Sequence, residues 1–151
     1  MSNIINRGTS LYSTSGPFLD SKLPKGRKIC LNMIIKESNP DMVINCIRDV
    51  AKNIDAVVIS DTGSPEKTLV DLTKFLKTEL KKPFKITRDL WKNFGHNRTV
   101  AVIHAEEYLF PDVITFKEWK DMDECFIMFM DADNITEGVP VWDRSKLNAD
   151  V

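Results

Sequence analysis

The stretch at residues 125–134 constrains the fold most, because five consecutive apolar side chains at residues 126–130 lead directly into the sequence Asp-Ala-Asp. A run that short, rich in aromatic side chains and set between charged segments, is typical of a strand buried on both faces rather than of a helix. Strands of this kind belong to covered, mostly parallel sheets, which bind ligands in the crevice outside their carboxyl ends. We therefore expect Asp131 and Asp133 to lie at a ligand site.

The spacing of these two acids indicates a cation. Asp131 and Asp133 offer hard oxygen donors, with no His or Cys between or beside them, which favours magnesium, manganese or calcium over zinc or copper. Magnesium usually takes one or two protein carboxylates and completes its shell with substrate phosphates. The sequence therefore predicts Mn²⁺ or Mg²⁺ bound by Asp131 and Asp133 and, through the metal, a diphosphate. On these residues alone the alternative stays open that the two acids only solvate a turn after a strand.

Composition argues against two classes of partner. The 21 basic and 22 acidic residues give a net charge of -1 without a long basic run, so nucleic acid is not an expected partner. No apolar run approaches the ~20 residues that a membrane-spanning helix needs, so no membrane span is expected. The three cysteines form no Cys-X-X-Cys pair, which is typical of reduced, buried thiols and predicts a cytoplasmic protein.

The chain divides into an extension and one domain. Residues 1–27 contain twelve Ser, Thr, Gly or Pro and no periodic apolar pattern, so they are predicted to form a flexible N-terminal extension. Residues 28–151 are then expected to form a single domain, since domains commonly have roughly 100 to 200 residues.

Strand and helix patterns alternate along this domain. Apolar runs predict strands at residues 28–35, 56–60, 84–87 and 126–130. Between the strands, apolar residues at helical spacing predict one helix capped by Asn39, a second that begins near residue 65, and a third over residues 97–109. This alternation favours an α/β fold, with a mostly parallel, Rossmann-like sheet flanked by helices. The remaining segment, residues 111–124, is predicted to be a loop or an insertion.

Four segments, taken in their order along the chain, resemble family-two glycosyltransferases of the GT-A fold. They are residues 29–36, residues 58–64 with Ser-Asp-Thr-Gly-Ser, residues 91–98 with Asn-Phe-Gly-His-Asn-Arg, and the Asp-Ala-Asp sequence at residues 131–133. The resemblance covers about residues 28–135. It implies a nucleotide-diphosphate sugar as donor, with UDP as the expected nucleotide, Mn²⁺ or Mg²⁺ as cofactor, and inverting transfer to an unidentified glycan, protein or lipid acceptor.

The resemblance also implies roles for individual residues. Asp61 would contact the base of the nucleotide, Arg98 would lie near the diphosphate, and Asp131 would bind the ribose and share the metal with the second Asp of its motif. Lys36 and Glu37, in the loop after the first strand, would contact the nucleotide sugar, although Lys-Glu-Ser stands here where the family usually has Lys-Asn-Glu. The residues themselves leave simpler roles open, because an Asp in a turn commonly caps backbone donors and an Arg on a helix is commonly solvated.

The chain is shorter than this resemblance requires. The family continues into an acceptor-binding half that supplies a carboxylate base, whereas 18 residues follow Asp133, and neither Asp143 nor Asp150 matches the family's catalytic sequence. We therefore expect a sheet truncated after its Asp-X-Asp strand and no identifiable general base. A strand left at such an edge also predicts a homo-oligomer or a second chain that docks through the surface around residues 126–130 and the tail at residues 135–151.

Two further functions remain as alternatives. A non-catalytic nucleotide-sugar-binding module is consistent with the missing acceptor half. A haloacid-dehalogenase-like phosphohydrolase would use Asp131 as a phosphate-accepting nucleophile. Position disfavours the phosphohydrolase, because such enzymes carry this sequence near their start and need a Lys and further acids after it.

Overall fold

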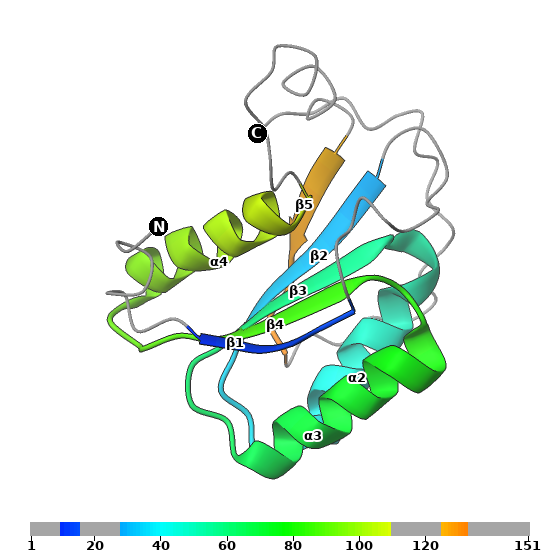
Figure 1. Cartoon of the computed structure of the whole chain (residues 1–151), viewed down its shortest axis with the longest axis horizontal. Helices are drawn as coiled ribbons and strands as arrows, with labels where there is room; N and C mark the ends of the chain where they lie inside the picture. Colours follow the sequence, from blue (N-terminus) through cyan, green and yellow to red (C-terminus); the bar gives the residue numbers. More distant parts are fainter. Residues whose placement is uncertain (1–9, 16–27, 110–124, 133–151) are drawn as a thin grey trace.

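The computed structural model describes residues 10–15, 28–109 and 125–132 (Figure 1). These residues form a five-stranded sheet with the strand order β1-β4-β3-β2-β5. Strands β2 (Lys28–Ile35), β3 (Ala56–Asp61), β4 (Phe84–Arg88) and β5 (Cys125–Phe129) are mutually parallel, and β1 (Ser10–Thr14) is antiparallel to β4. The predicted α/β architecture with a mostly parallel sheet flanked by helices is confirmed, and it is compatible with a Rossmann-like fold.

Helices cover both faces of this sheet (Figure 1). Helix α2 (Pro40–Val50) continues into the 3-10 turn η2 (Ala51–Asn53), and α3 (Glu66–Phe75) continues into the π-helical turn η3 (Leu76–Leu80). Both pack on one face, whereas α4 (Phe94–Leu109) packs on the other, against β2 and β3. In chain order, each parallel strand is therefore connected to the next by a segment that contains a helix packed on the sheet, as the alternating sequence pattern predicts.

Local sequence signals decide where the helices begin. The Asn39 side chain accepts a hydrogen bond from the backbone N–H of Asp41 (3.1 Å), so the predicted cap of α2 is confirmed. Helix α4 begins three residues before the predicted position, at Phe94. The reason is a second Asn cap, because the Asn93 Oδ1 atom accepts from the backbone N–H of His96 (2.8 Å).

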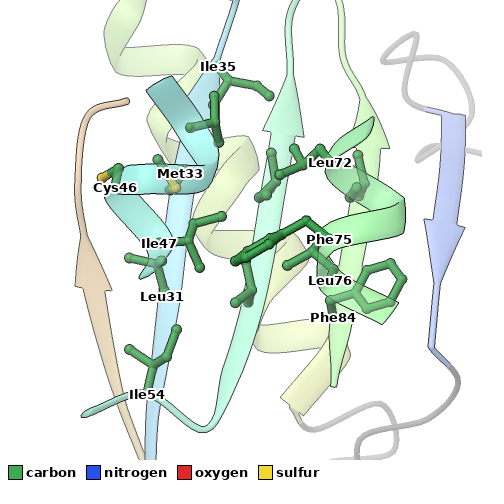
Figure 2. Packing of buried hydrophobic residues seen from close by; sticks show 14 of the residues in the cluster. Leu31, Met33, Ile35, Cys46, Ile47, Ile54, Leu72, Phe75, Leu76 and Phe84 are labelled. Atoms are coloured by element: carbon green, nitrogen blue, oxygen red, sulfur yellow. The ribbon is translucent and has the colours of Figure 1, made fainter. Parts of the chain in front are cut away.

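The main core lies between the sheet and helices α2 and α3 (Figure 2). Side chains alternate between the faces of a strand, so Leu31 and Met33 of β2 point into this core while Cys30 and Asn32 lie on the α4 side. Seventeen buried residues make up the cluster, and the largest include Leu31, Met33, Ile35, Ile47, Ile59, Leu69, Leu72, Leu76 and Phe84. Apolar burial on this scale is the dominant stabilising term of the fold.

The structure adds a strand that the sequence did not predict. Strand β1 lies inside the segment expected to be a flexible extension, yet it pairs with β4, with a shift in register between Leu11 and Ser13. Its sequence is mostly polar and its side chains are exposed or only half-buried, so no alternating apolar pattern revealed it. Residues 1–9 and 16–27 lie outside the described residues.

Strand β5 is found where the sequence predicts it, but its burial differs. It is the last strand in the sheet order and, in the described residues, pairs with β2 alone. Residues 126–130 are half-buried, so the expectation of a strand fully buried on both faces is wrong for the described structure. The segments at residues 111–124 and 133–151, and with them Asp133, lie outside the described residues.

Candidate functional site

The carboxyl ends of four parallel strands meet at one edge of the sheet. In register, Ile35 of β2 lies beside Asp61 of β3, which lies beside Arg88 of β4, and β5 ends next to β2. The loops that follow these strands carry the predicted residues Lys36, Glu37 and Asp131. The parallel topology therefore brings the predicted residues of these two loops, together with Asp61 at the end of β3, to a single edge.

The loops after β2 and β3 are tied to each other. The backbone N–H of Glu37 donates to the Ser64 hydroxyl (2.9 Å), and the Glu37 Oε1 atom accepts from the backbone N–H of Asn39 (3.0 Å). Lys36 is exposed, and its side chain lies over Gly63, where a Cβ would come within 3.4 Å of the Lys36 Cε atom. In this state Glu37 acts as a turn residue, and Lys36 contributes an exposed ammonium group at the sheet edge.

Asp61 is almost fully buried, with 1% of its surface exposed. Its Oδ1 atom accepts from the backbone N–H of Ser64 (3.0 Å), and its Oδ2 atom accepts from the backbone N–H of Gly63 (3.3 Å). Arg88 approaches the same Oδ2 atom, with its Nε at 3.6 Å. Asp61 thus caps the turn between β3 and α3, although a carboxylate with about four acceptor positions retains capacity for a further donor.

Arg88, which the sequence did not single out, links several parts of this edge. It contacts Asp61, lies 3.2 Å from the Glu66 carboxylate with its Nη1 atom, and donates from Nη2 to the Ser64 carbonyl (3.1 Å). Its guanidinium carbon lies 5.7 Å from the centre of the Tyr12 ring. No sequence signal could have identified Arg88, because its partners come from β1, the β3–α3 turn and α3.

Arg98 lies in the first turns of α4, as predicted, and its exposed side chain contacts two phenyl rings. Its guanidinium carbon is 4.3 Å from the centre of the Phe129 ring and 5.4 Å from that of Phe94. The side chain also lines an open groove of about 430 Å³ between α4 and β5, to which Gly95, Thr99, Val102, Ile103, Glu106 and Phe129 contribute. The two ring faces attract the guanidinium charge and restrict the side chain, while its N–H groups stay accessible.

The hydrogen bonding of Arg98 differs from that of the other described arginines. Arg48 pairs with Glu79 at 2.7 Å, and Arg88 contacts Asp61 and Glu66. Arg98 makes no hydrogen bond or ion pair within the residues that the structure describes. Arg98 is therefore a cation that two phenyl rings contact and whose N–H donors are available for an external anion.

Asp131 is exposed at the same edge, two residues after Phe129. Its backbone carbonyl accepts a weak hydrogen bond from the Cys46 thiol of α2 (3.5 Å). In the described part of the chain no group of three or more His, Cys, Asp or Glu side chains could hold a metal by itself. An exposed carboxylate nevertheless fits Mn²⁺ or Mg²⁺, because these ions take one or two carboxylates when substrate phosphates supply other ligands.

A buried polar network lies behind this edge, beneath α4. Asp89 accepts hydrogen bonds from the Ser60 hydroxyl and from the Thr87 hydroxyl (2.8 Å), and its Oδ1 atom is 2.9 Å from the Nε2 atom of His104. Both Asp89 and His104 are buried. The network joins β3, β4 and α4, so it fixes α4, and with it Arg98, relative to the sheet. The sequence did not reveal this network, because its members look like isolated polar residues until the chain is folded.

Comparisons with known proteins give no family for this chain. No protein-family model matches it, and no curated protein matches it. Within the described ranges, no helix is long and apolar enough to cross a membrane.

Proposed function

We propose that this chain is a glycosyltransferase of the GT-A type, or the donor-binding part of one, that binds a UDP-sugar through Mn²⁺ or Mg²⁺. In an enzyme of this class the sugar passes to an acceptor hydroxyl with inversion, and the nucleoside diphosphate leaves. The residues assigned to donor binding are Lys36, Glu37, Asp61, Arg98 and Asp131. The general base and the acceptor are unassigned.

The observation that carries the proposal is the state of Arg98. Two rings lie against its guanidinium, and no carboxylate within the described residues forms an ion pair with it. Arg98 is exposed, so water occupies its donors in the free state and an arriving anion can replace that water, and a guanidinium matches phosphate oxygens with two parallel hydrogen bonds. The start of α4 adds partial positive charge at the same place.

The position of Asp131 supports the same ligand. Phe129, on which Arg98 stacks, precedes Asp131 by two residues, so their Cα atoms are at most about 7 Å apart. A diphosphate bound by Arg98 would therefore lie near the carboxylate expected to hold the metal. When bound, the metal would neutralise charge on the leaving diphosphate as a Lewis acid.

Asp61 has a second role in this proposal. In the present state it orders the turn at residues 61–64, and nearly all of its surface is covered. Contact with a nucleotide base therefore requires movement of the Lys36 side chain that lies over Gly63, while the turn itself keeps its geometry. Such a shift upon binding would expose the remaining acceptor positions of the carboxylate.

Calorimetric titration of UDP tests the proposal. We expect tighter binding with Mn²⁺ than with a chelator, and a loss of about tenfold or more in Arg98→Ala, since charge-assisted hydrogen bonds contribute about 1.5–3 kcal/mol. Arg48→Ala is the matched control, because Arg48 also lies over a phenyl ring, that of Phe75 at 5.4 Å, but far along α2 from the sheet edge. Equal UDP affinity in wild type and Arg98→Ala, or no dependence on the metal, would remove the basis of this assignment.

A further inference from the structure

The contacts of Arg88 go beyond the residues of the proposed donor site. Arg88 is the last residue of β4, and its side chain is 39% exposed. It reaches the Asp61 carboxylate, the Ser64 carbonyl and the Glu66 carboxylate at 3.6, 3.1 and 3.2 Å. One cation thus joins the end of β3, the turn after it and the first turn of α3.

The positive charge of Arg88 stabilises the turn at residues 61–64. Asp61 is 1% exposed, and a buried carboxylate is costly unless donors and a cation compensate it. The backbone N–H groups of Gly63 and Ser64 supply two donors, and Arg88 supplies the cation. Without Arg88, the Asp61 carboxylate would favour solvent, and the turn that depends on its two hydrogen bonds would lose its fixed geometry.

Strand β1 in turn supports Arg88. Tyr12 lies with its ring centre 5.7 Å from the guanidinium carbon, and its strand pairs with β4, Ser10 lying opposite Arg88. An aromatic face beside a guanidinium restricts its orientation and attracts its charge. The chain of contacts therefore runs from Tyr12 to Arg88 and from Arg88 to the Asp61 turn.

We propose that Arg88 is a positioning residue of the donor site, which holds the Asp61 turn in the geometry that recognises the nucleotide base, and that Tyr12 of β1 holds Arg88. This inference rests on the proposed function. It assigns base recognition to the β1–β4–β3 side of the edge and diphosphate binding to the Arg98 and Asp131 side. Arg88 acts on the ligand only through Asp61 and the turn.

Two probes separate these sides: UDP, which carries the base, and inorganic diphosphate, which does not, each titrated in the presence of Mg²⁺. Arg88→Gln should weaken UDP binding about tenfold and leave diphosphate binding unchanged. Arg98→Ala should weaken both. A variant that is simply less stable would lose affinity for both ligands, so the ratio of the two affinities distinguishes positioning from general destabilisation.

Milder variants keep the test informative if Arg88→Gln folds poorly. Tyr12→Leu removes the aromatic face, and Glu66→Gln removes one exposed ion pair. Tyr12→Leu should lower UDP affinity several-fold, and Tyr12→Phe, which keeps the ring, should restore most of it. In parallel, amide hydrogen exchange at Gly63 and Ser64 should be faster in Tyr12→Leu and Arg88→Gln than in wild type.

The outcomes separate the two proposals. If wild type binds UDP and diphosphate but Arg88→Gln binds UDP as tightly as wild type, or loses both ligands equally, the positioning role is overturned and the proposed function stands. If wild type binds neither probe, the proposed function fails, and the role of Arg88 in a donor site fails with it. Selective loss of UDP, accompanied by faster exchange of the two amides, is the result that supports the inference.

Discussion

The two faces of the sheet pack against their helices through different kinds of interaction. On the α2 and α3 face, β2, β3 and β4 present branched and aromatic side chains to a cluster of seventeen buried residues. On the α4 face, small apolar residues such as Ala56 and Ala105 accompany a buried hydrogen-bonded network around Asp89. Apolar contacts are non-directional, whereas hydrogen bonds fix orientation. The first face mainly stabilises the fold, and the second orients the helix that carries Arg98.

The largest expected difference in stability is between two leucine-to-alanine substitutions, one on each face of the sheet. Leu72 of α3 and Leu109 of α4 are both buried, at 0% and 2% exposure. We expect Leu72→Ala to lower the free energy of unfolding by about 3–5 kcal/mol and Leu109→Ala by about 2–3 kcal/mol, because the larger buried cluster around Leu72 should collapse less into the vacated space than the smaller cluster around Leu109. Urea unfolding measures both. Equal losses would mean that the two faces do not differ in packing.

The buried network predicts the next largest effect. Asp89→Asn keeps the side-chain shape but removes the charge and replaces one carboxylate oxygen with an NH2 group, so the side chain can no longer accept both at the position shared by Ser60 and Thr87 and at the position that faces His104. We expect a loss of about 2–3 kcal/mol in the free energy of unfolding. Ser60→Ala, which removes one donor to the network, should cost about 1 kcal/mol. If Asp89→Asn were as stable as wild type, the network would not be what fixes α4.

The glycines at the beginnings of α3 and α4 should differ in how well they tolerate a side chain. This third expected difference in stability is smaller. Gly63, before α3, has a φ of 141°, and an added Cβ would lie 3.4 Å from the Lys36 Cε atom. Gly95, in the first turn of α4, would place its Cβ 3.6 Å from the Asn93 Oδ1 atom, an ordinary contact. We expect Gly63→Ala to destabilise by about 1–2 kcal/mol and Gly95→Ala to be neutral or stabilising by up to about 1 kcal/mol. Thermal unfolding of the pair checks this, and the reverse order would contradict it.

Substitution of Lys85 should have the smallest effect on stability, and that effect should depend on pH. It lies on β4, and burial lowers the pKa of its ammonium group, a shift that Glu107 and Asp89 partly oppose. A lysine whose folded pKa lies below its unfolded value destabilises the native state while charged. The penalty is complete below the folded pKa and disappears as the pH rises from there toward the unfolded value of about 10.4.

Lys85→Met should therefore raise stability at pH 7, and the gain should shrink as the pH approaches about 10. Unfolding curves measured at both pH values test the sign. Lys67→Met is the control, because Lys67 is exposed on α3 and should change stability little at either pH. A gain that grows with pH would show that Lys85 is stabilised by its acidic neighbours rather than penalised by burial.

Much of the fold was predictable because its signals are local. The β-branched run of β3 and the Asn39 cap of α2 depend on residues within a few positions of one another. The predicted strands and the shared carboxyl edge follow from these signals and from the rule that parallel strands need helical crossovers. Strand β1 escaped prediction because a short, polar edge strand forms only when β4 is present to pair with it.

The sequence by itself determined the order of the elements, the parallel sheet and the edge at which Lys36, Glu37, Asp61 and Asp131 lie. It could not determine the state of these residues, because the contacts involved are distant in the chain. Phe129 is 31 positions from the arginine on which it stacks, and Asp61 is 27 positions from Arg88. Only the tertiary structure decided that Asp61 is buried in its turn and lies beside Arg88. It also decided that Arg98 contacts two phenyl rings and has no counter-ion among the described residues. The physical reason is that chain periodicity sets which face a side chain occupies, whereas charge pairing and burial depend on which elements pack beside it.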